Sequence, residues 1–112
     1  MTRETHTATL SSTEAGGAAV VDRSALRYYP GWYHTVQAEV TDTATGDPAV
    51  AAGGTLSVRA KIRGAGTYQE LGTINLAAPE PAIFEGYFIA LEAVSTGFDA
   101  DKTWTLYVSE GR

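Results

Sequence analysis

The stretch Thr55-Leu56-Ser57-Val58-Arg59-Ala60-Lys61-Ile62-Arg63 alternates apolar and polar side chains without a break. Because successive side chains of a β-strand point to opposite faces, this pattern predicts a strand with one buried and one solvated face. The inward side chains are expected to be Leu56, Val58, Ala60 and Ile62, and the outward ones Thr55, Ser57, Arg59, Lys61 and Arg63. The outward face therefore carries a cationic stripe.

Two other segments have the same period of two. Residues 32–41 place on one face Trp32, His34, Val36, Ala38 and Val40. Residues 103–108 place on one face Trp104, Leu106 and Val108. Turn-forming residues follow the first segment at 42–48 and precede the second at 96–102. Both segments predict half-buried strands.

Turn and loop signals divide the rest of the C-terminal part. Gly64-Ala65-Gly66 has a length suited to a hairpin, so residues 67–76 are expected to return as a strand that Gly72 bulges or interrupts. Residues 77–81 contain two prolines and predict a loop.

Residues 83–94 are apolar on both faces, which fits either a central strand or a short helix. Their Phe, Tyr and Ile residues, the internal Gly86 and the lack of a capping box at the start favour the strand.

Residues 1–31 are rich in Thr, Ser, Ala and Gly and show no sustained period, apart from the apolar run 18–21. We expect an N-terminal arm and lead-in over 1–31 and one β domain over 32–112. Thr5, Thr7 and Thr9 alternate with less polar neighbours, so part of the arm can also add as a short strand. The predicted fold class is all-β, a single antiparallel β-sandwich or small barrel with an irregular N-terminal arm.

The composition disfavours several kinds of site and partner. The chain has 112 residues, the size of one domain, and no cysteine, so disulfides and thiolate metal sites are not available to it. Its net charge of −5 opposes binding to nucleic acid or to an anionic membrane surface. The start has no apolar leader, which predicts synthesis in the cytoplasm without a signal peptide, unless a signal-free route exports the protein.

Two groups of residues are candidates for binding. The first is a partner-binding set, in which the arm pairs with a neighbouring subunit and the cationic stripe meets acidic groups; it comprises Thr5, Thr7, Thr9, Arg59, Lys61 and Arg63. A solvated strand face is the alternative for the stripe. The second is an aromatic platform for carbohydrate, with core or subunit packing as the alternative, made of Tyr28, Tyr29, Trp32 and Tyr33.

No residue pattern predicts catalysis, a metal or a cofactor. The pair Asp99 and Asp101 lacks a complete calcium loop and is expected to cap a turn. Glu85 and Glu92 fall on opposite faces if they lie on one strand, about 23 Å apart at ~3.3 Å per residue, which is too far for a glycosidase pair. A small hydrolase would need His34 beside a carboxylate in a pocket. We therefore expect a protein that is not an enzyme.

A resemblance to a known class of proteins rests on four quoted segments: 54–61 (Gly-Thr-Leu-Ser-Val-Arg-Ala-Lys), 67–72 (Thr-Tyr-Gln-Glu-Leu-Gly), 84–91 (Phe-Glu-Gly-Tyr-Phe-Ile-Ala-Leu) and the Thr-rich stretch 95–108. Over residues 53–108 the chain resembles the small β-domain structural proteins of tailed bacteriophages. The resemblance implies a non-enzymatic virion protein, foremost a capsid decoration (cement) protein, located in the virion.

The resemblance also implies partners. They would be other virion proteins, in the capsid or the tail, and further copies of the chain in a homo-oligomer, with a trimer as one option. The alternative function is a tail or fibre accessory module that binds carbohydrate on the host surface.

Overall fold

The computed structural model describes residues 5–12, 18–22, 33–62, 66–86, 88 and 90–111. These residues form eight strands: β1 (Thr5–Ser12), β2 (Ala18–Asp22), β3 (Tyr33–Asp42), β4 (Thr55–Lys61), β5 (Gln69–Asn75), β6 (Ala82–Glu85), β7 (Ala90–Thr96) and β8 (Lys102–Gly111). Among the described residues, no helix has the length and apolarity needed to cross a membrane.

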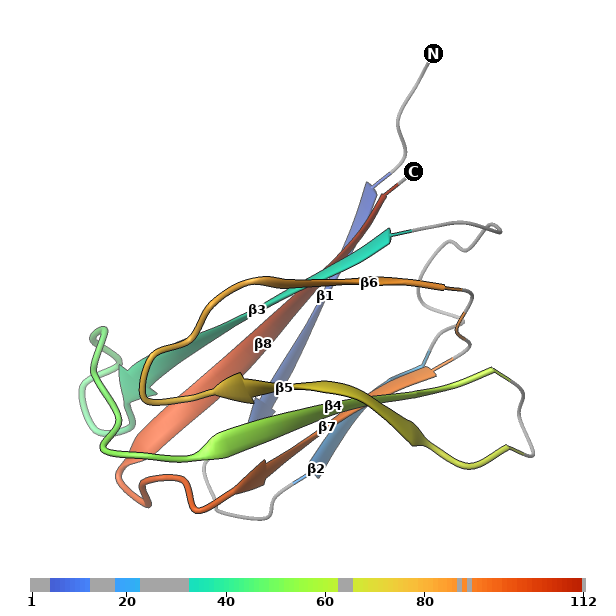
Figure 1. Ribbon diagram of the computed structural model, residues 1–112. Helices are drawn as coiled ribbons and strands as arrows, with labels where there is room; N and C mark the ends of the chain where they lie inside the picture. The colour runs from blue at the N-terminus through green and yellow to red at the C-terminus, as the bar shows by residue number, and fades with distance from the viewer. Residues whose placement is uncertain are drawn as a thin grey trace.

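The strands make two antiparallel four-stranded sheets, in the orders β1-β8-β3-β6 and β2-β7-β4-β5 (Figure 1). We call them sheet A and sheet B. Buried side chains from both sheets form one core between them, so the predicted all-β antiparallel sandwich is confirmed and the barrel alternative is not adopted.

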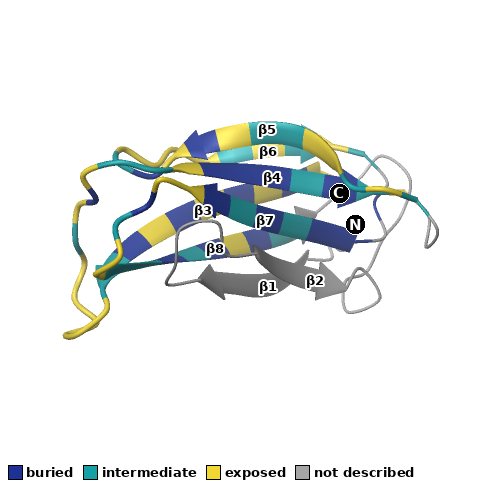
Figure 2. Cartoon of the chain, turned by 90° about the horizontal axis from the view of Figure 1, so that it is seen from below, coloured by how far each residue is buried: buried dark blue, intermediate teal, exposed yellow. Residues whose placement is uncertain are grey.

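The strands β3 and β8 are the longest and pair in register from Tyr33–Gly111 to Asp42–Lys102. Their inward faces follow the predicted alternation, which Figure 2 shows as bands of buried and exposed residues along β3. Every predicted inward residue of β3 and β8 that the structure describes is buried: His34, Val36, Ala38, Val40, Trp104, Leu106 and Val108.

The hairpin prediction is confirmed, since β4 and β5 pair antiparallel. The register shifts between Val58 and Arg59: Val58 pairs with Gly72 and Arg59 with Glu70, which leaves Leu71 as the extra residue of a β-bulge beside Gly72. A Cβ on Gly72 would lie 3.1 Å from the ring of Phe84 on β6, so the glycine lets the two sheets approach at this edge.

One predicted core residue is wrong. Ile62 is 70% exposed, because β4 ends at Lys61 and Ile62 already belongs to the connection to β5. Leu56, Val58 and Ala60 are buried as predicted. Alternation thus identified the strand but overran its end by one inward position.

Within residues 83–94 the described residues form strands and no helix, as favoured, but they are not one central strand. β6 pairs with β3 in sheet A, whereas β7 lies between β2 and β4 in sheet B. The chain crosses between the sheets after Glu85. A Cβ on Gly86 would lie 2.6 Å from Cζ of Phe88, so this crossing packs over the Phe88 ring only with a glycine.

The irregular arm predicted over residues 1–31 is wrong for two of its segments. β1 pairs with β8 over Thr5–Ser12, and β2 pairs with β7 over Ala18–Asp22, so each adds an outer strand to one sheet. β1 and β2 contact each other. β1 and β2 thus supply one lateral edge of the sandwich, beside a six-stranded core formed by the strands from β3 onward.

A pair of truncations checks the core. We expect Leu56→Ala to lower the free energy of unfolding by about 2–5 kcal/mol, because Leu56 is fully buried. Ile62→Ala should change it by less than about 0.5 kcal/mol, because that side chain is exposed. Urea unfolding of both variants measures the difference, and equal losses would place Ile62 in the core after all.

Candidate functional site

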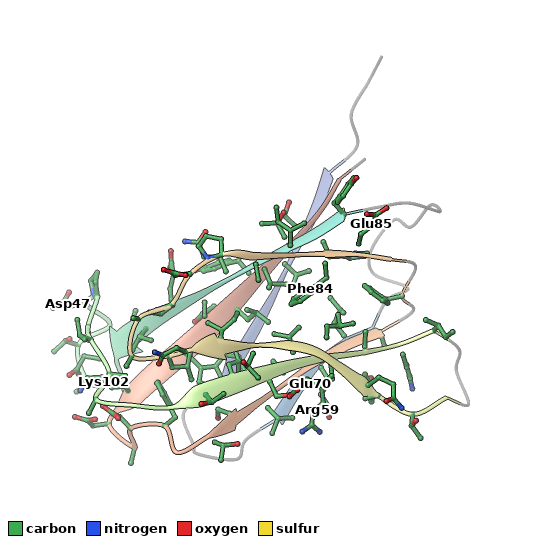
Figure 3. The ribbon with its side chains drawn as sticks, viewed as in Figure 1. Asp47, Arg59, Glu70, Phe84, Glu85 and Lys102 are labelled. Atoms are coloured by element: carbon green, nitrogen blue, oxygen red, sulfur yellow. The ribbon has the colours of Figure 1, made fainter. Side chains whose placement is uncertain are left out.

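The cationic stripe lies on the outer face of sheet B, but its described members already have neighbours within the chain. Arg59 pairs in register with Glu70 of β5 on one side and Glu92 of β7 on the other. Its Nε donates a hydrogen bond to Ser57 Oγ at 3.1 Å, and Ser57 Oγ donates to Glu70 Oε1 at 2.7 Å. Figure 3 shows Arg59 and Glu70 side by side.

The bulge in β5 makes this arrangement. If the regular register continued from the pair Val58–Gly72, Arg59 would pair with Leu71. The bulge pairs Arg59 with Glu70 and leaves Leu71 to pack against the core. The same network explains why Ser57, which alternation predicted on the outer face, is only 9% exposed.

The remaining stripe residues differ in environment. Lys61 is half-buried, and its Nζ lies 5.0 Å from the centre of the Tyr68 ring, in the range of a cation–π contact. Arg63 lies outside the described residues. Arg59 therefore lies between acidic residues and Lys61 over an aromatic ring, which differs from an open cationic strip.

The three arm residues of the partner-binding set lie on β1. Thr5, Thr7 and Thr9 pair in register with Gly111, Ser109 and Tyr107 of β8. This pairing places them on the outer strand of sheet A. The added strand that the sequence allowed is thus present, with the chain's own β8 as its partner.

Of the aromatic platform only Tyr33 can be described; Tyr28, Tyr29 and Trp32 lie outside the described residues. Tyr33 is 50% exposed on the outer face of sheet A. The same face carries Tyr107, which is 39% exposed and pairs with Gln37. Sequence reasoning missed Tyr107 as a surface aromatic, because it gave the rings of β8 no role beyond alternation.

His34 is a core residue. It is fully buried, its Nδ1 donates to the Phe84 carbonyl oxygen at 3.2 Å, and its ring centre lies 4.8 Å from that of Phe88. An enclosed imidazole among aromatic rings does not favour the hydrolase hypothesis. Within the described part of the chain, no three His, Cys, Asp or Glu side chains gather as a metal site.

The acidic residues of the turns cap the backbone. Asp99 Oδ2 accepts a hydrogen bond from the Ala52 amide at 2.8 Å, which ties together two loops at one end of the sandwich. Asp42 Oδ1 accepts from Ala44 N at 2.9 Å, as in an Asx turn. Asp42 thus caps its own turn, whereas the Asp99 side chain joins two loops and does not cap its own turn as predicted.

Asp101 forms an ion pair with Lys102 at 2.9 Å. The hydrogen bond from Lys102 lowers the pKa of the Asp101 carboxyl and raises the pKa of Lys102. The Asp101 side chain is exposed, so water screens the pair, although the Lys102 side chain is largely covered.

Glu85 and Glu92 also need a correction. They do not lie on one strand, since Glu85 is on β6 of sheet A and Glu92 on β7 of sheet B. Their pairing partners, Tyr33 and Arg59, are on different sheets as well. The structure therefore gives these two carboxylates no common site.

Comparisons with known proteins support the fold. No family model and no curated protein matches the chain. A solved structure of Bacillus endospore appendages, described as a novel family of disulfide-linked pili, has a TM-score of 0.54 and 17% identity, covering 98% of this chain and 87% of that one. At this identity the likeness is one of fold alone, and the 112 residues hold no cysteine for a disulfide link.

Two further structures are more distant. A Yersinia pseudotuberculosis-derived mitogen has a TM-score of 0.48 and 13% identity, covering 96% of this chain and 84% of that one. A structure reported under CBM4 structure and function has a TM-score of 0.40 and 12% identity, covering 93% and 82%. We draw no argument from either.

A double-mutant cycle checks the network under Arg59. We expect Ser57→Ala and Glu70→Ala each to lower the free energy of unfolding by about 1 kcal/mol. The double variant should lose less than the sum, by roughly 0.5–1 kcal/mol, because both changes remove the same hydrogen bond. Strict additivity in chemical denaturation would mean that the two side chains do not interact.

Proposed function

We propose that the chain is a non-enzymatic structural protein of a tailed-bacteriophage virion, foremost a capsid decoration protein that binds neighbouring virion subunits. The observation that carries the proposal is the position of β1 and β2. One N-terminal segment adds an outer strand to each sheet on the same side of a six-stranded core.

This arrangement suits assembly because strand pairing has the same geometry within a chain and between chains. Residues 5–12 can pair with β8 of their own chain or, in the same register, with β8 of another copy. A subunit that exchanges such a strand becomes linked to its neighbour by a full ladder of main-chain hydrogen bonds. The acidic net charge of −5 is compatible with a place on the outside of a particle, away from packaged DNA.

Hydrogen-bond parity identifies the atoms involved. Ala49 N donates to Val40 O, and Asp42 N donates to Asp47 O, on the side of β3 away from β8. Because backbone groups of a strand alternate in direction, the amides and carbonyls of all even-numbered β3 residues point to that side. Odd-numbered residues such as Gln37 thus bond to β8, at Tyr107. On β8 the groups of Leu106 and Val108 are left to bond β1, opposite Leu10 and Ala8.

Deletion of residues 1–15 is expected to leave a cooperatively folded protein that no longer self-associates, because β1 is gone while the six-stranded core remains. Light scattering of purified protein over about 10–200 µM measures this. The full chain should form an oligomer of defined mass and the truncated chain a monomer. If both have the same mass, β1 has no part in assembly.

Proline substitutions give a matched control that keeps the chain length. Ala8→Pro removes an amide that bonds β8 and should reduce the assembled fraction, whereas Thr9→Pro removes one that faces away and should have less effect. Equal effects of the two prolines would mean that the amides of β1 do not alternate between bonding β8 and facing away from it.

A second candidate is a tail or fibre module that binds host carbohydrate. It is favoured by the exposed rings of Tyr33 and Tyr107 on one face of sheet A. Gln37, four residues from Tyr33 and thus about 14 Å along β3, adds an amide. Such polar-edged rings are typical of sugar platforms.

Binding to a glycan array tests this candidate. Retention on any glycan that is lost in Tyr33→Ala and in Tyr107→Ala, but kept in Ile62→Ala, would support the carbohydrate module. If the protein is not retained on any glycan, or if retention survives both tyrosine changes, assembly remains as the single proposed function.

A further inference from the structure

The strand β6 forms the edge of sheet A on the side opposite β1 (Figure 1). Its residues Ala82–Glu85 pair with β3, and within the described residues no strand lies beyond them. Ile83 is 65% exposed and pairs with the exposed Thr35, so its side chain lies on the outer face of the sheet. An apolar side chain on an open edge favours pairing with a strand of another chain.

The main-chain groups of Ile83 point away from the sheet at this edge. Because even-numbered residues of β3 turn their groups away from β8, His34 and Val36 bond to Phe84 and Ala82. Backbone groups alternate along β6 as well, so the amide and carbonyl of Ile83 face away from β3. No turn or loop among the described residues bonds to them. The edge thus presents a donor and an acceptor at an exposed residue.

The open edge is limited at both ends. Pro81, directly before β6, has a carbonyl but no N–H. After Glu85 the chain crosses to sheet B. An incoming strand therefore finds hydrogen-bonding groups over only a few residues, and a longer partner gains nothing beyond them. The strand that matches this length is one limited at the same two points, which is β6 of a second copy.

We propose that β6 pairs antiparallel with β6 of a second copy, around a two-fold axis at Ile83. The Ile83 amide of each copy donates to the Ile83 carbonyl of the other, and each Glu85 amide donates to the Pro81 carbonyl of the other copy. The two Ile83 side chains lie next to each other on the outer face, as a cross-strand pair of β-branched residues. Sheet A then continues from one copy into the next.

The residues around Ile83 select this register. Shifts come in steps of two, since only odd-numbered residues of β6 turn their groups outward. A shift in one direction pairs Ile83 with Pro81, which has no N–H for the Ile83 carbonyl. A shift in the other direction pairs Ile83 with Glu85 and brings the two Glu85 residues within about 8 Å, where like charges repel. In the proposed register they lie about 14 Å apart.

This contact is separate from the exchange of β1. The strands β1 and β6 lie on opposite sides of sheet A, so one copy can use both. A contact through the four residues of β6 is far smaller than the interface of a stable dimer, so it is weak in dilute solution and acts between copies crowded on one surface. The inference rests on the assembly function proposed above, but its test does not require β1 to exchange.

Disulfide trapping tests the pairing, because the chain has no cysteine of its own. In the full chain, Ile83→Cys places the two substituted residues about 5.5 Å apart between Cα atoms, which a disulfide can bridge. Under mild oxidation we expect covalent dimers at least tenfold faster than with Val50→Cys, at a position outside β6 that is 80% exposed. Equal rates would mean that the copies crosslink by random collision and would overturn the proposal.

Glu85→Cys checks the register. It should crosslink with itself at least tenfold more slowly than Ile83→Cys, because its counterpart lies about 14 Å away. Mass spectrometry of a one-to-one mixture of the two variants identifies the pairs that form. Mixed pairs in excess of Ile83→Cys homodimers would mean that the strands pair in a shifted register and would overturn the proposal.

Amide resonances of the ¹⁵N-labelled parent protein add a readout that needs no cysteine. Between about 0.1 and 2 mM the Ile83 amide resonance should shift, whereas the amide of Phe84, which bonds to β3, should not. Ile83→Lys should reduce the shift at this position at least tenfold, and Ile62→Lys, at an exposed site outside β6, should leave it unchanged. An Ile83 amide that does not respond to concentration would contradict the pairing.

Discussion

The antiparallel pairing of β3 with β8 is the constraint on which the rest of the structure depends. Ten residues of each strand are in register, so both strands turn the same faces inward and outward. The inward face supplies a large share of the buried side chains, including the fully buried Trp104 and His34. One side of the pair then receives β1 and the other β6, and the proposed exchange between copies takes place on the β1 side.

Much of this arrangement could be predicted from local patterns. Alternation is a property of the strand itself, so it identified β3, β4 and β8 and most of their buried residues. It failed where a strand's end or its partner decides the outcome. Ile62 continues the period of β4, but nothing in its side chain marks the point at which the chain leaves the sheet. Residues 83–94 are apolar on both faces because they contain an edge strand of one sheet and an inner strand of the other.

The candidate sites depend still more on register. The sequence placed Arg59 outward correctly, but it could not place Glu70 and Glu92 on either side of it, since those partners come from other strands and one of them depends on a bulge. The N-terminal strands contain many Thr and Ala residues and show no sustained period, so their pairing with β8 and β7 is also a long-range outcome.

Residues 5–12 pair with β8 in the register found here, and on assembly we expect them to exchange between copies. The chain has no cysteine, so Ser11→Cys with Thr105→Cys makes a unique reporter of that pairing. After oxidation, non-reducing electrophoresis of dilute protein should give crosslinked monomers, and the assembled sample should give covalent oligomers. Crosslinked monomers alone in the assembled sample, or no crosslink in either, would contradict the account.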